Sequence, residues 1–431
     1  MLSEIDKELL NSEKQFGFCR NSSCDHAVFV LTETLRLLKY KKQKAVVVAI
    51  DASKAFDKMN RELLWVKLMN KVNPTILKSL INYYKVSKAY VMNESETSKE
   101  FKTTIGCKQG GPLSPRLFSI YIDELANKIE ASNLGVKIGK MLVNILMYAD
   151  DVVLLADDKN KMRQMIKIAE QYGNELEIKF NPSKTECMTV NDKKKSRAMN
   201  MKLKMNDIII NEVDKIKYLG NIITKKLKND VHLSNRRRLS MTSKHKIEGT
   251  GFDSENMSLD TKSMLYKTYV RSILVYGIGN MKLNSGEVRR MQTFESNVIK
   301  TSLGLSNRMR STDILNALYI NKFHKKVALI KCGLGIRLID NTYTKLFLKE
   351  LLSEYRTKIN KKSVVHELFE ITNTNTSSVE LLRENCEKKI RLCRSRFKEE
   401  TENNKRTVAI RYLLKAKRKE ELVSIIGSHL R

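Results

Sequence analysis

Two adjacent carboxylates stand out in the stretch Tyr148-Ala149-Asp150-Asp151, because largely apolar runs flank them on both sides. The runs at 143–147 and 152–156 are short and mostly aliphatic, so they predict two buried strands joined by a tight hairpin. Like charges at the tip of such a hairpin repel each other and resist desolvation, and they usually persist only where something positive binds them. A pair of Mg²⁺ ions would meet that need, whereas a solvated turn is the ordinary explanation of a lone Asp-Asp.

A third carboxylate, Asp51, ends another apolar run. Residues 44–50 are rich in valine, so they predict a strand that delivers Asp51 at its C-terminal end. The remaining pattern predicts helices over 61–68, 75–86, 112–129 and 161–173, and a strand that begins at Ile178-Lys179-Phe180. The order strand, helix, hairpin, helix, strand is that of the ferredoxin-like split βαβ fold.

In a sheet of this order, Asp51 and Asp150 can be neighbours although they lie far apart in the sequence. Two or three carboxylates could then share two metal ions. Two Mg²⁺ ions roughly 3.5–4 Å apart clamp an in-line phosphoryl displacement, in which one ion activates a 3′-hydroxyl and the other holds the triphosphate. The carboxylates therefore predict nucleotidyl transfer.

The blocks around these carboxylates resemble those of a known family, the reverse transcriptases of non-LTR retrotransposons, with group II intron and telomerase enzymes as more distant relatives. Residues 51–57 resemble the first palm motif of that family. The resemblance implies that Asp51 and the adjacent Ala52 belong to the metal site. It also implies that Phe56 is the steric gate that excludes a ribose 2′-hydroxyl.

Two further blocks extend the resemblance through the palm. Residues 106–115 resemble the Q-G-x-x-L-S-P block, which implies that Gln109 and Gly110 line the nucleotide and template side of the site. The stretch from Tyr148 to Asp151 is then the catalytic hairpin. The resemblance makes Asp150 the second metal ligand, Asp151 a ligand or close neighbour, and Tyr148 a substrate contact.

The blocks after the hairpin resemble the same family. Residues 181–185 match the motif whose lysine, here Lys184, stabilises or protonates the leaving pyrophosphate. Residues 217–220 resemble the primer-grip hairpin, and 274–277 resemble a thumb motif. The residues expected to contact primer or template are Tyr218, Leu219, Gly220, Arg236, Arg237 and Arg238.

The start of the chain departs from the family. The block Gln15-Phe16-Gly17-Phe18 arrives almost at the first residue, so we expect the fingers to be incomplete and to lack the strands and the basic segment that usually precede this block. Cys19 stands where the family often has an arginine, which leaves Arg20 as a shifted substitute at the triphosphate. We find no endonuclease domain or Cys/His knuckle, so we expect the polymerase core of a longer element, or a truncated copy.

The composition indicates a polyanionic partner. The formal net charge is +32, from 80 Lys and Arg against 48 Asp and Glu, which favours nucleic acid. Basic runs that could grip a duplex backbone are Lys193-Lys194-Lys195-Ser196-Arg197, Arg236-Arg237-Arg238, Arg289-Arg290, Lys325-Lys326 and Lys417-Arg418-Lys419. No apolar stretch of about 18 residues and no signal sequence is visible, so we expect no membrane partner. The expected location is intracellular, with access to the nucleus if the element is active.

These observations predict an α+β fold, a right-hand polymerase with a ferredoxin-like palm, truncated fingers and a helical basic thumb and C-terminal region. Partial fingers are expected at 1–43 and 69–108, and the palm, which is the reverse transcriptase catalytic core, at 44–68 and 109–224. The thumb is expected at 225–335, and a helical basic region at 336–431.

The expected activity is RNA-directed DNA polymerisation with two Mg²⁺ ions, or Mn²⁺ in their place, on an RNA template and a DNA primer with dNTPs. One alternative is a degenerate reverse-transcriptase fold that binds nucleic acid without polymerising. An RNA-dependent RNA polymerase would share the palm, but Phe56 argues against it because a bulky gate excludes ribonucleotides. A metal-dependent phosphodiesterase would also use paired aspartates, but it leaves the Q-G and L-S-P block unexplained.

Overall fold

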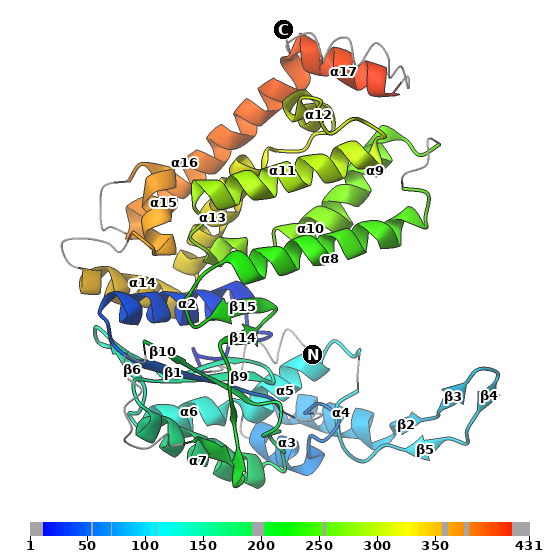
Figure 1. The fold of residues 1–431 in the computed structure, drawn as a ribbon. Helices are drawn as coiled ribbons and strands as arrows, with labels where there is room; N and C mark the ends of the chain where they lie inside the picture. The colour runs from blue at the N-terminus through cyan, green and yellow to red at the C-terminus, as the bar shows by residue number, and fades with distance from the viewer. Residues whose placement is uncertain are drawn as a thin grey trace. The chain divides into compact units, whose positions relative to one another are not determined.

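The protein divides into two compact units in a computed structural model (Figure 1). The first unit comprises residues 1–227 and 341–358, and the second comprises residues 228–340 and 359–431. The structure describes residues 12–52, 55–69, 71–108, 110–191, 202–252, 256–355, 361–374 and 379–415. Gln109 and the basic runs at 193–197 and 417–419 lie outside the described residues. The finer division into fingers, palm and thumb stays a prediction.

A five-stranded sheet forms the centre of the first unit. β1 (Ala45–Ile50) lies between β10 (Glu186–Val190) and β9 (Asp151–Ala156) and runs antiparallel to both. β8 (Ile145–Tyr148) pairs with β9 through the predicted hairpin, and β13 (Asn211–Glu212) pairs in parallel with β10. The strand order β13-β10-β1-β9-β8 contains the antiparallel four-strand order of the ferredoxin-like fold, which confirms that prediction.

Helices cover both faces of this sheet. Figure 1 shows α2 and α14 on one face and α6 and α7 on the other. Because neither face meets water, β1 is apolar throughout, with the sequence Ala-Val-Val-Val-Ala-Ile. The helices of this unit are α2 (Cys24–Tyr40), α3 (Arg61–Leu68), α4 (Pro74–Lys85), α5 (Ser114–Ile122), α6 (Glu124–Ala131), α7 (Lys159–Glu175) and α14 (Thr342–Tyr355).

The single helix expected over 112–129 is two helices, α5 and α6, which meet at Asp123. The Asp123 carboxylate accepts hydrogen bonds of 2.9 and 3.1 Å from the Ser12 amide. In addition, the Ala126 amide donates to the Asp123 carbonyl in a tighter i→i+3 bond. Apolar spacing continues through the junction, so the sequence pattern does not reveal it.

The strand expected to begin at Ile178 is wrong. Phe180 makes one isolated bridge to Ala52, and no ladder follows it. The next residues include Pro182, which cannot donate a ladder hydrogen bond, so the strand β10 begins only at Glu186.

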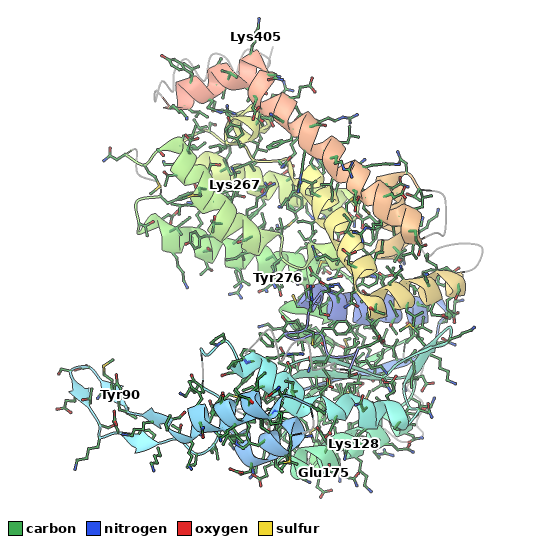
Figure 2. The ribbon with its side chains drawn as sticks, turned by 180° about the vertical axis from the view of Figure 1, so that it is seen from behind. Tyr90, Lys128, Glu175, Lys267, Tyr276 and Lys405 are labelled. Atoms are coloured by element: carbon green, nitrogen blue, oxygen red, sulfur yellow. The ribbon has the colours of Figure 1, made fainter. Side chains whose placement is uncertain are left out.

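A narrow β-arm projects from the first unit (Figure 2). It consists of two short ladders, one between β2 (Lys88–Ala89) and β5 (Phe101–Lys102), the other between β3 (Met92–Asn93) and β4 (Glu96–Thr97). Tyr90 lies in this arm and is exposed. The other small hairpins are β6 (Val136–Ile138) with β7 (Met141–Val143), β11 (Lys204–Met205) with β12 (Ile208–Ile209), and β14 (Lys215–Tyr218) with β15 (Asn221–Thr224).

The second unit is helical throughout its described residues. It contains α8 (Asp230–Glu248), α9 (Leu259–Leu265), the π-helix η1 (Tyr266–Arg271), α10 (Ser272–Leu274), the 3₁₀-helix η2 (Ile278–Asn280), α11 (Ser285–Ser302), α12 (Ser311–Ala317), α13 (Phe323–Asp340), α15 (Val364–Thr372), α16 (Val379–Lys398), the π-helix η3 (Glu399–Asn403) and α17 (Lys405–Lys415). Within the described part of the chain, no helix is both long enough and apolar enough to cross a membrane.

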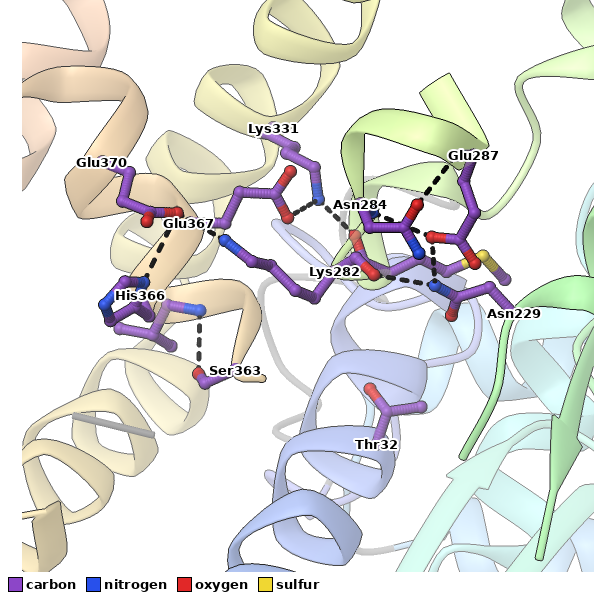
Figure 3. A network of polar contacts seen from close by, with 12 residues as sticks. Thr32, Asn229, Lys282, Asn284, Glu287, Lys331, Ser363, His366, Glu367 and Glu370 are labelled. Atoms are coloured by element: carbon purple, nitrogen blue, oxygen red, sulfur yellow. Dashed lines mark hydrogen bonds and ion pairs between the residues drawn. The ribbon is translucent and has the colours of Figure 1, made fainter. Parts of the chain in front are cut away.

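A polar network joins α15 to the core of the second unit (Figure 3). The fully buried Lys331 of α13 pairs with Glu367 at 2.9 Å and donates to the Met281 carbonyl. Nearby, Lys282 pairs with Glu370. A buried ammonium is tolerated only with such partners, so these contacts fix α15 against α13.

Candidate active site

The hairpin predicted around Asp150 and Asp151 forms. β8 ends at Tyr148 and β9 begins at Asp151, and these two residues face each other across the ladder. Between them Ala149 is buried with a φ of +55°, a left-handed conformation that costs a non-glycine residue about 1–2 kcal/mol. Asp150 is half-buried and Asp151 is exposed. The strained turn therefore needs support from its surroundings.

The segment that precedes α2 supplies this support. Gln15 bridges in parallel to Met147 beside β8, and the Phe16 amide donates to the Met147 carbonyl at 2.8 Å. The Gln15 side chain is 2% exposed, and its oxygen accepts hydrogen bonds from the amides of Ala149 at 3.1 Å and Gly17 at 2.9 Å. One buried side chain thus holds the backbone of the turn between β8 and β9.

Gly17 passes too close to the turn for any other residue. A Cβ on Gly17 would lie 2.4 Å from the Ala149 nitrogen and 2.8 Å from the Tyr148 carbonyl carbon. The Ser119 hydroxyl of α5 donates to the Gly17 carbonyl at 3.0 Å and fixes the segment from the other side. The glycine is therefore a packing requirement of the hairpin.

Asp51 directly follows β1 and is held by the loop after α7. The Asn181 amide donates to the Asp51 carbonyl at 2.8 Å, and the Asp51 amide donates to the buried Thr185 hydroxyl at 3.4 Å. Lys184 lies on the same loop, with its Nζ 4.0 Å from Asp51 Oδ2. The structure therefore brings Asp51 and Lys184 together.

Neighbouring carboxylate charges act on Asp150 and Asp151. Partial burial raises the pKa of Asp150, and the charge of Asp51 raises it further. Partial burial, followed by the charges of Asp150 and Asp51, raises the pKa of Asp151 to about 6, while Lys217 opposes the rise. Neighbouring like charges disfavour the ionised form, so this end of the sheet favours a bound cation.

The carboxylates fit a divalent cation by donor type. Carboxylate oxygens are ligands that Mg²⁺ and Mn²⁺ prefer. Among the described residues, no three His, Cys, Asp or Glu side chains stand where they could hold a metal ion by themselves. Mg²⁺ is usually bound by one or two carboxylates together with water and substrate phosphates, so a complete protein cage is not expected here.

Phe56 packs on Phe118 of α5, with ring centroids 4.5 Å apart, and remains half-exposed. Its carbonyl accepts a hydrogen bond of 2.8 Å from the Cys107 amide, which ties the segment after Asp51 to the Q-G block. Gly110 has a φ of +77°, and no atom lies within 4 Å of a Cβ built on it. Its backbone conformation, rather than crowding, therefore favours glycine.

The hairpin expected to grip the primer also forms near the carboxylates. Tyr218 pairs with Asn221, and the turn residues Leu219 and Gly220 have φ values of +45° and +71°, as a type I′ turn requires. Tyr218 is buried, and its hydroxyl donates to the Leu146 carbonyl at 3.4 Å. This bond holds the hairpin against β8.

The expected basic residues differ in exposure. Arg20 is exposed. In α8, Arg236 is buried and its guanidinium lies 4.5 Å from the Tyr276 ring centroid. Arg237 is partly exposed and Arg238 is exposed, so these two present charge to solvent while Arg236 packs inside the second unit.

Comparison with known proteins now decides the family. The profile of the family described as "Reverse transcriptase (RNA-dependent DNA polymerase)" matches residues 1–223, more than half of the 431 residues. The chain belongs to the reverse transcriptase family. This membership confirms the right-hand polymerase fold class, and the non-LTR resemblance is confirmed by the named relatives. Reverse transcriptases generally use divalent metal ions.

The curated relatives of this reverse transcriptase come from mobile elements. The Pol polyprotein from the type-2 retrotransposable element R2DM of Drosophila melanogaster is 27% identical over 181 residues, 41% of this chain and 17% of the relative. The RNA-directed DNA polymerase from mobile element jockey of Drosophila funebris is 22% identical over 325 residues, 73% of this chain and 34% of the relative. The chain therefore spans about a third or less of their length.

The solved structures that resemble this reverse transcriptase include telomerases. Telomerase from Candida tropicalis in complex with a fragment of telomeric RNA is 13% identical, with a TM-score of 0.38 over 80% of this chain and 52% of that chain. Apo telomerase from the same organism is 12% identical, with a TM-score of 0.38 over 92% of this chain and 55% of that chain.

The sequence motifs did not predict the roles of three residues at this site. Gln15 and Gly17 served only as landmarks of their block, although the structure places both against the catalytic turn. Thr185 lies beside Lys184 in its motif and accepts a hydrogen bond from the Asp51 amide. The motif letters contained these residues, but only the three-dimensional contacts assign them a role.

Proposed function

We propose that this chain is the reverse transcriptase part of a non-LTR retrotransposon and extends a DNA primer on an RNA template with dNTPs. The observation that carries the proposal is the placement of three carboxylates: Ile50 of β1 pairs with Val152 of β9, so Asp51 at the end of β1 lies beside Asp150 and Asp151 at the tip of the β8–β9 hairpin. The name of the jockey relative, RNA-directed DNA polymerase, supports the same reaction.

In this proposal Asp51, with the adjacent Ala52, and Asp150 hold two Mg²⁺ ions, and Asp151 is a third ligand or close neighbour. When bound, the ions would activate the primer 3′-hydroxyl and neutralise charge on the leaving pyrophosphate. Lys184, whose Nζ lies 4.0 Å from Asp51, donates a proton to that pyrophosphate.

The remaining expected residues bind the nucleotide and the primer and select the sugar. Phe56 excludes the ribose 2′-hydroxyl, while Gln109, Gly110 and Tyr148 line the nucleotide side. Arg20 contacts the triphosphate. The primer is held by the Tyr218–Gly220 turn and by the cations of α8, of which Arg237 and Arg238 are accessible. We expect an intracellular location, with access to the nucleus if the element is active.

Primer extension tests the proposal. The purified chain is given an RNA template with an annealed DNA primer, dNTPs and Mg²⁺, and is compared with Asp150→Asn and with the control Asp207→Asn, which removes one exposed carboxylate elsewhere in the first unit. We expect Asp150→Asn to lower kcat by at least about a thousandfold, because the charge that holds the metal is lost. The Asp207→Asn protein should keep its activity.

Two outcomes would contradict the proposal. If the chain binds template-primer tightly but extends nothing, the fold serves binding alone. If ribonucleotides are incorporated in preference to dNTPs when the two compete, the enzyme is an RNA polymerase rather than a reverse transcriptase.

A further inference from the structure

The second half of α16 is an exposed basic helix. The buried residues of α16 are Val379, Leu382 and Cys386, all in its first half, where the helix packs against α13. From position 387 to 398 no residue is buried. The inward residues Ile390, Cys393 and Phe397 are only partly buried, so this segment gains less from tertiary packing than the first half of the helix, and its density of cations needs another explanation.

The cations of this segment are poorly neutralised. Among the residues that the structure describes, the side chains of Lys388, Lys389, Arg394 and Arg396 have no ion-pair or hydrogen-bond partner. Two further cations have weak partners: Arg391 lies 3.5 Å from Glu387, and Lys398 lies 3.8 Å from Glu402. Like charges this close repel each other unless a polyanion binds them, so the array complements a phosphate backbone.

The cations flank a narrow central strip of the outer face. Successive helical residues turn by about 100°, which places Lys388, Leu392 and Ser395 in line opposite the buried stripe. Lys389 and Arg396 then lie on one side of this strip, and Arg391, Arg394 and Lys398 lie on the other. Leu392 is 43% exposed. The helix thus presents two basic flanks around a less charged centre.

We propose that the second half of α16 binds double-stranded DNA by lying in the major groove. The B-form major groove is about 12 Å wide and admits an α-helix, with phosphates on both walls for the two flanks. The major groove of an A-form duplex is too narrow and deep for this contact. The exposed stretch from 387 to 398 is about 18 Å long and could face several phosphates on each wall.

This site is separate from the cations of α8. In both views of the second unit, α11 and α13 lie between α8 and α16 (Figures 1 and 2). A duplex held by Arg237 and Arg238 would therefore not reach the outer face of α16 without bending around this unit. The inference goes beyond the proposed polymerase activity, because it gives the chain a second nucleic-acid contact that is specific for B-form DNA.

The test compares two charge-matched variants of the full chain. In one, Lys388, Lys389, Arg394 and Arg396 are each changed to Gln, which keeps helix propensity. In the control, four exposed lysines of the first unit, Lys137, Lys140, Lys167 and Lys204, are changed to Gln. Binding to a blunt DNA duplex, an RNA duplex of the same sequence and a single-stranded RNA is measured by fluorescence anisotropy over a range of salt concentrations.

We expect the α16 variant to lose at least about tenfold in affinity for the DNA duplex and its salt-dependence slope to fall by about 3–4, since each lost phosphate contact removes about 0.9. Its affinity for the RNA duplex should change by less than about threefold, and its primer extension on RNA should be unchanged. A ligand that occupies the major groove of the DNA should displace the protein from the duplex, and a minor-groove ligand should not. An equal loss for both duplexes, an equal loss in the control variant, or an unchanged DNA affinity would each overturn the proposal.

Discussion

Gln15 and Ala149 are joined by a hydrogen bond of 3.1 Å, which runs from the Ala149 amide to the side-chain oxygen of Gln15. The two residues come from segments that are far apart in the sequence, and both are buried. Ala149 has a left-handed conformation at the tip of the β8–β9 hairpin, so this bond from the segment before α2 stabilises a strained turn.

Replacing Gln15 should therefore affect catalysis as well as stability. Gln15→Ala leaves the buried Ala149 amide without its acceptor, which costs about 1–3 kcal/mol of unfolding free energy. We expect kcat for primer extension to fall by about tenfold or more, because the carboxylates lose a fixed position. The control is Gln164→Ala on the exposed face of α7, which should change neither quantity. An unchanged kcat in Gln15→Ala would show that the turn keeps its conformation without the hydrogen bond to Gln15.

Gly17→Ala should be more damaging than its size suggests. The new Cβ would lie 2.4 Å from the Ala149 nitrogen, and that backbone has to move. We expect a loss of about 1–3 kcal/mol in denaturant unfolding and a strong loss of extension activity. At Gly249, by contrast, a new Cβ meets nothing closer than the Lys246 carbonyl oxygen at 3.7 Å. Gly249→Ala is the matched control, and equal effects of the two variants would refute the close-approach argument.

The raised pKa of Asp151 predicts how stability depends on pH. Its pKa is about 6 in the folded chain against an ordinary 3.8, so the folded state binds the proton more tightly. This stabilisation is fully present below pH 3.8 and is lost as pH rises through 6. We expect Asp151→Asn to be more stable than the parent at pH 7.5, by on the order of 1 kcal/mol because solvent screens an exposed side chain, with the gap closing near pH 4.

The same titration should control metal binding. A protonated Asp151 offers no charge to a cation, so Mg²⁺ affinity should fall as pH is lowered through 6. Calorimetric titration of Mg²⁺ in the presence of template-primer and a non-hydrolysable dNTP would measure it. The pH dependence between 5 and 7 should be weaker in Asp151→Asn than in the parent; an equal dependence in both proteins would assign the titration to another group.

Phe56 should set the choice of sugar. Phe56→Ala removes a half-exposed ring beside Asp51, and we expect the preference for dNTP over NTP in kcat/KM to fall by about 10- to 100-fold. Phe118→Leu is the control, because Phe118 is fully buried beneath Phe56. That variant should lower the melting temperature while keeping the preference for dNTPs. If both variants keep the preference, the gate lies elsewhere.

Lys184→Ala should separate catalysis from stability. The Lys184 and Asp51 side chains are 68% and 41% exposed, so their pair contributes less than about 1 kcal/mol to folding. If Lys184 protonates the leaving pyrophosphate, single-turnover rates should fall by about 10²-fold or more. Lys179→Ala, an exposed lysine nearby, should be neutral in both assays. If Lys184→Ala lowers the melting temperature but leaves the single-turnover rate unchanged, Lys184 has a structural role and does not protonate the pyrophosphate.

The sequence by itself determined the elements whose signal is local. Alternating or continuous apolar runs gave β1, β8 and β9, and helical spacing gave α3, α4 and α7 close to their observed bounds. The motif order placed Asp51 and Asp150 at strand ends of one sheet. The sequence also failed locally, at Ile178 and at the break between α5 and α6, where a proline and a distant Ser12 amide decide the outcome.

Only the tertiary structure decided how the catalytic turn is held. Hydrogen bonds from Ala149 to Gln15, and from Asp51 to Thr185, join segments that are 134 residues apart in each case. The periodicity of apolar residues shows which face of a segment is buried. It does not show which distant backbone amide will donate a hydrogen bond to a buried oxygen. The carboxylates of Tyr148-Ala149-Asp150-Asp151 could therefore be recognised from their order in the chain, whereas their support, their raised pKa values and the burial of Arg236 follow from packing.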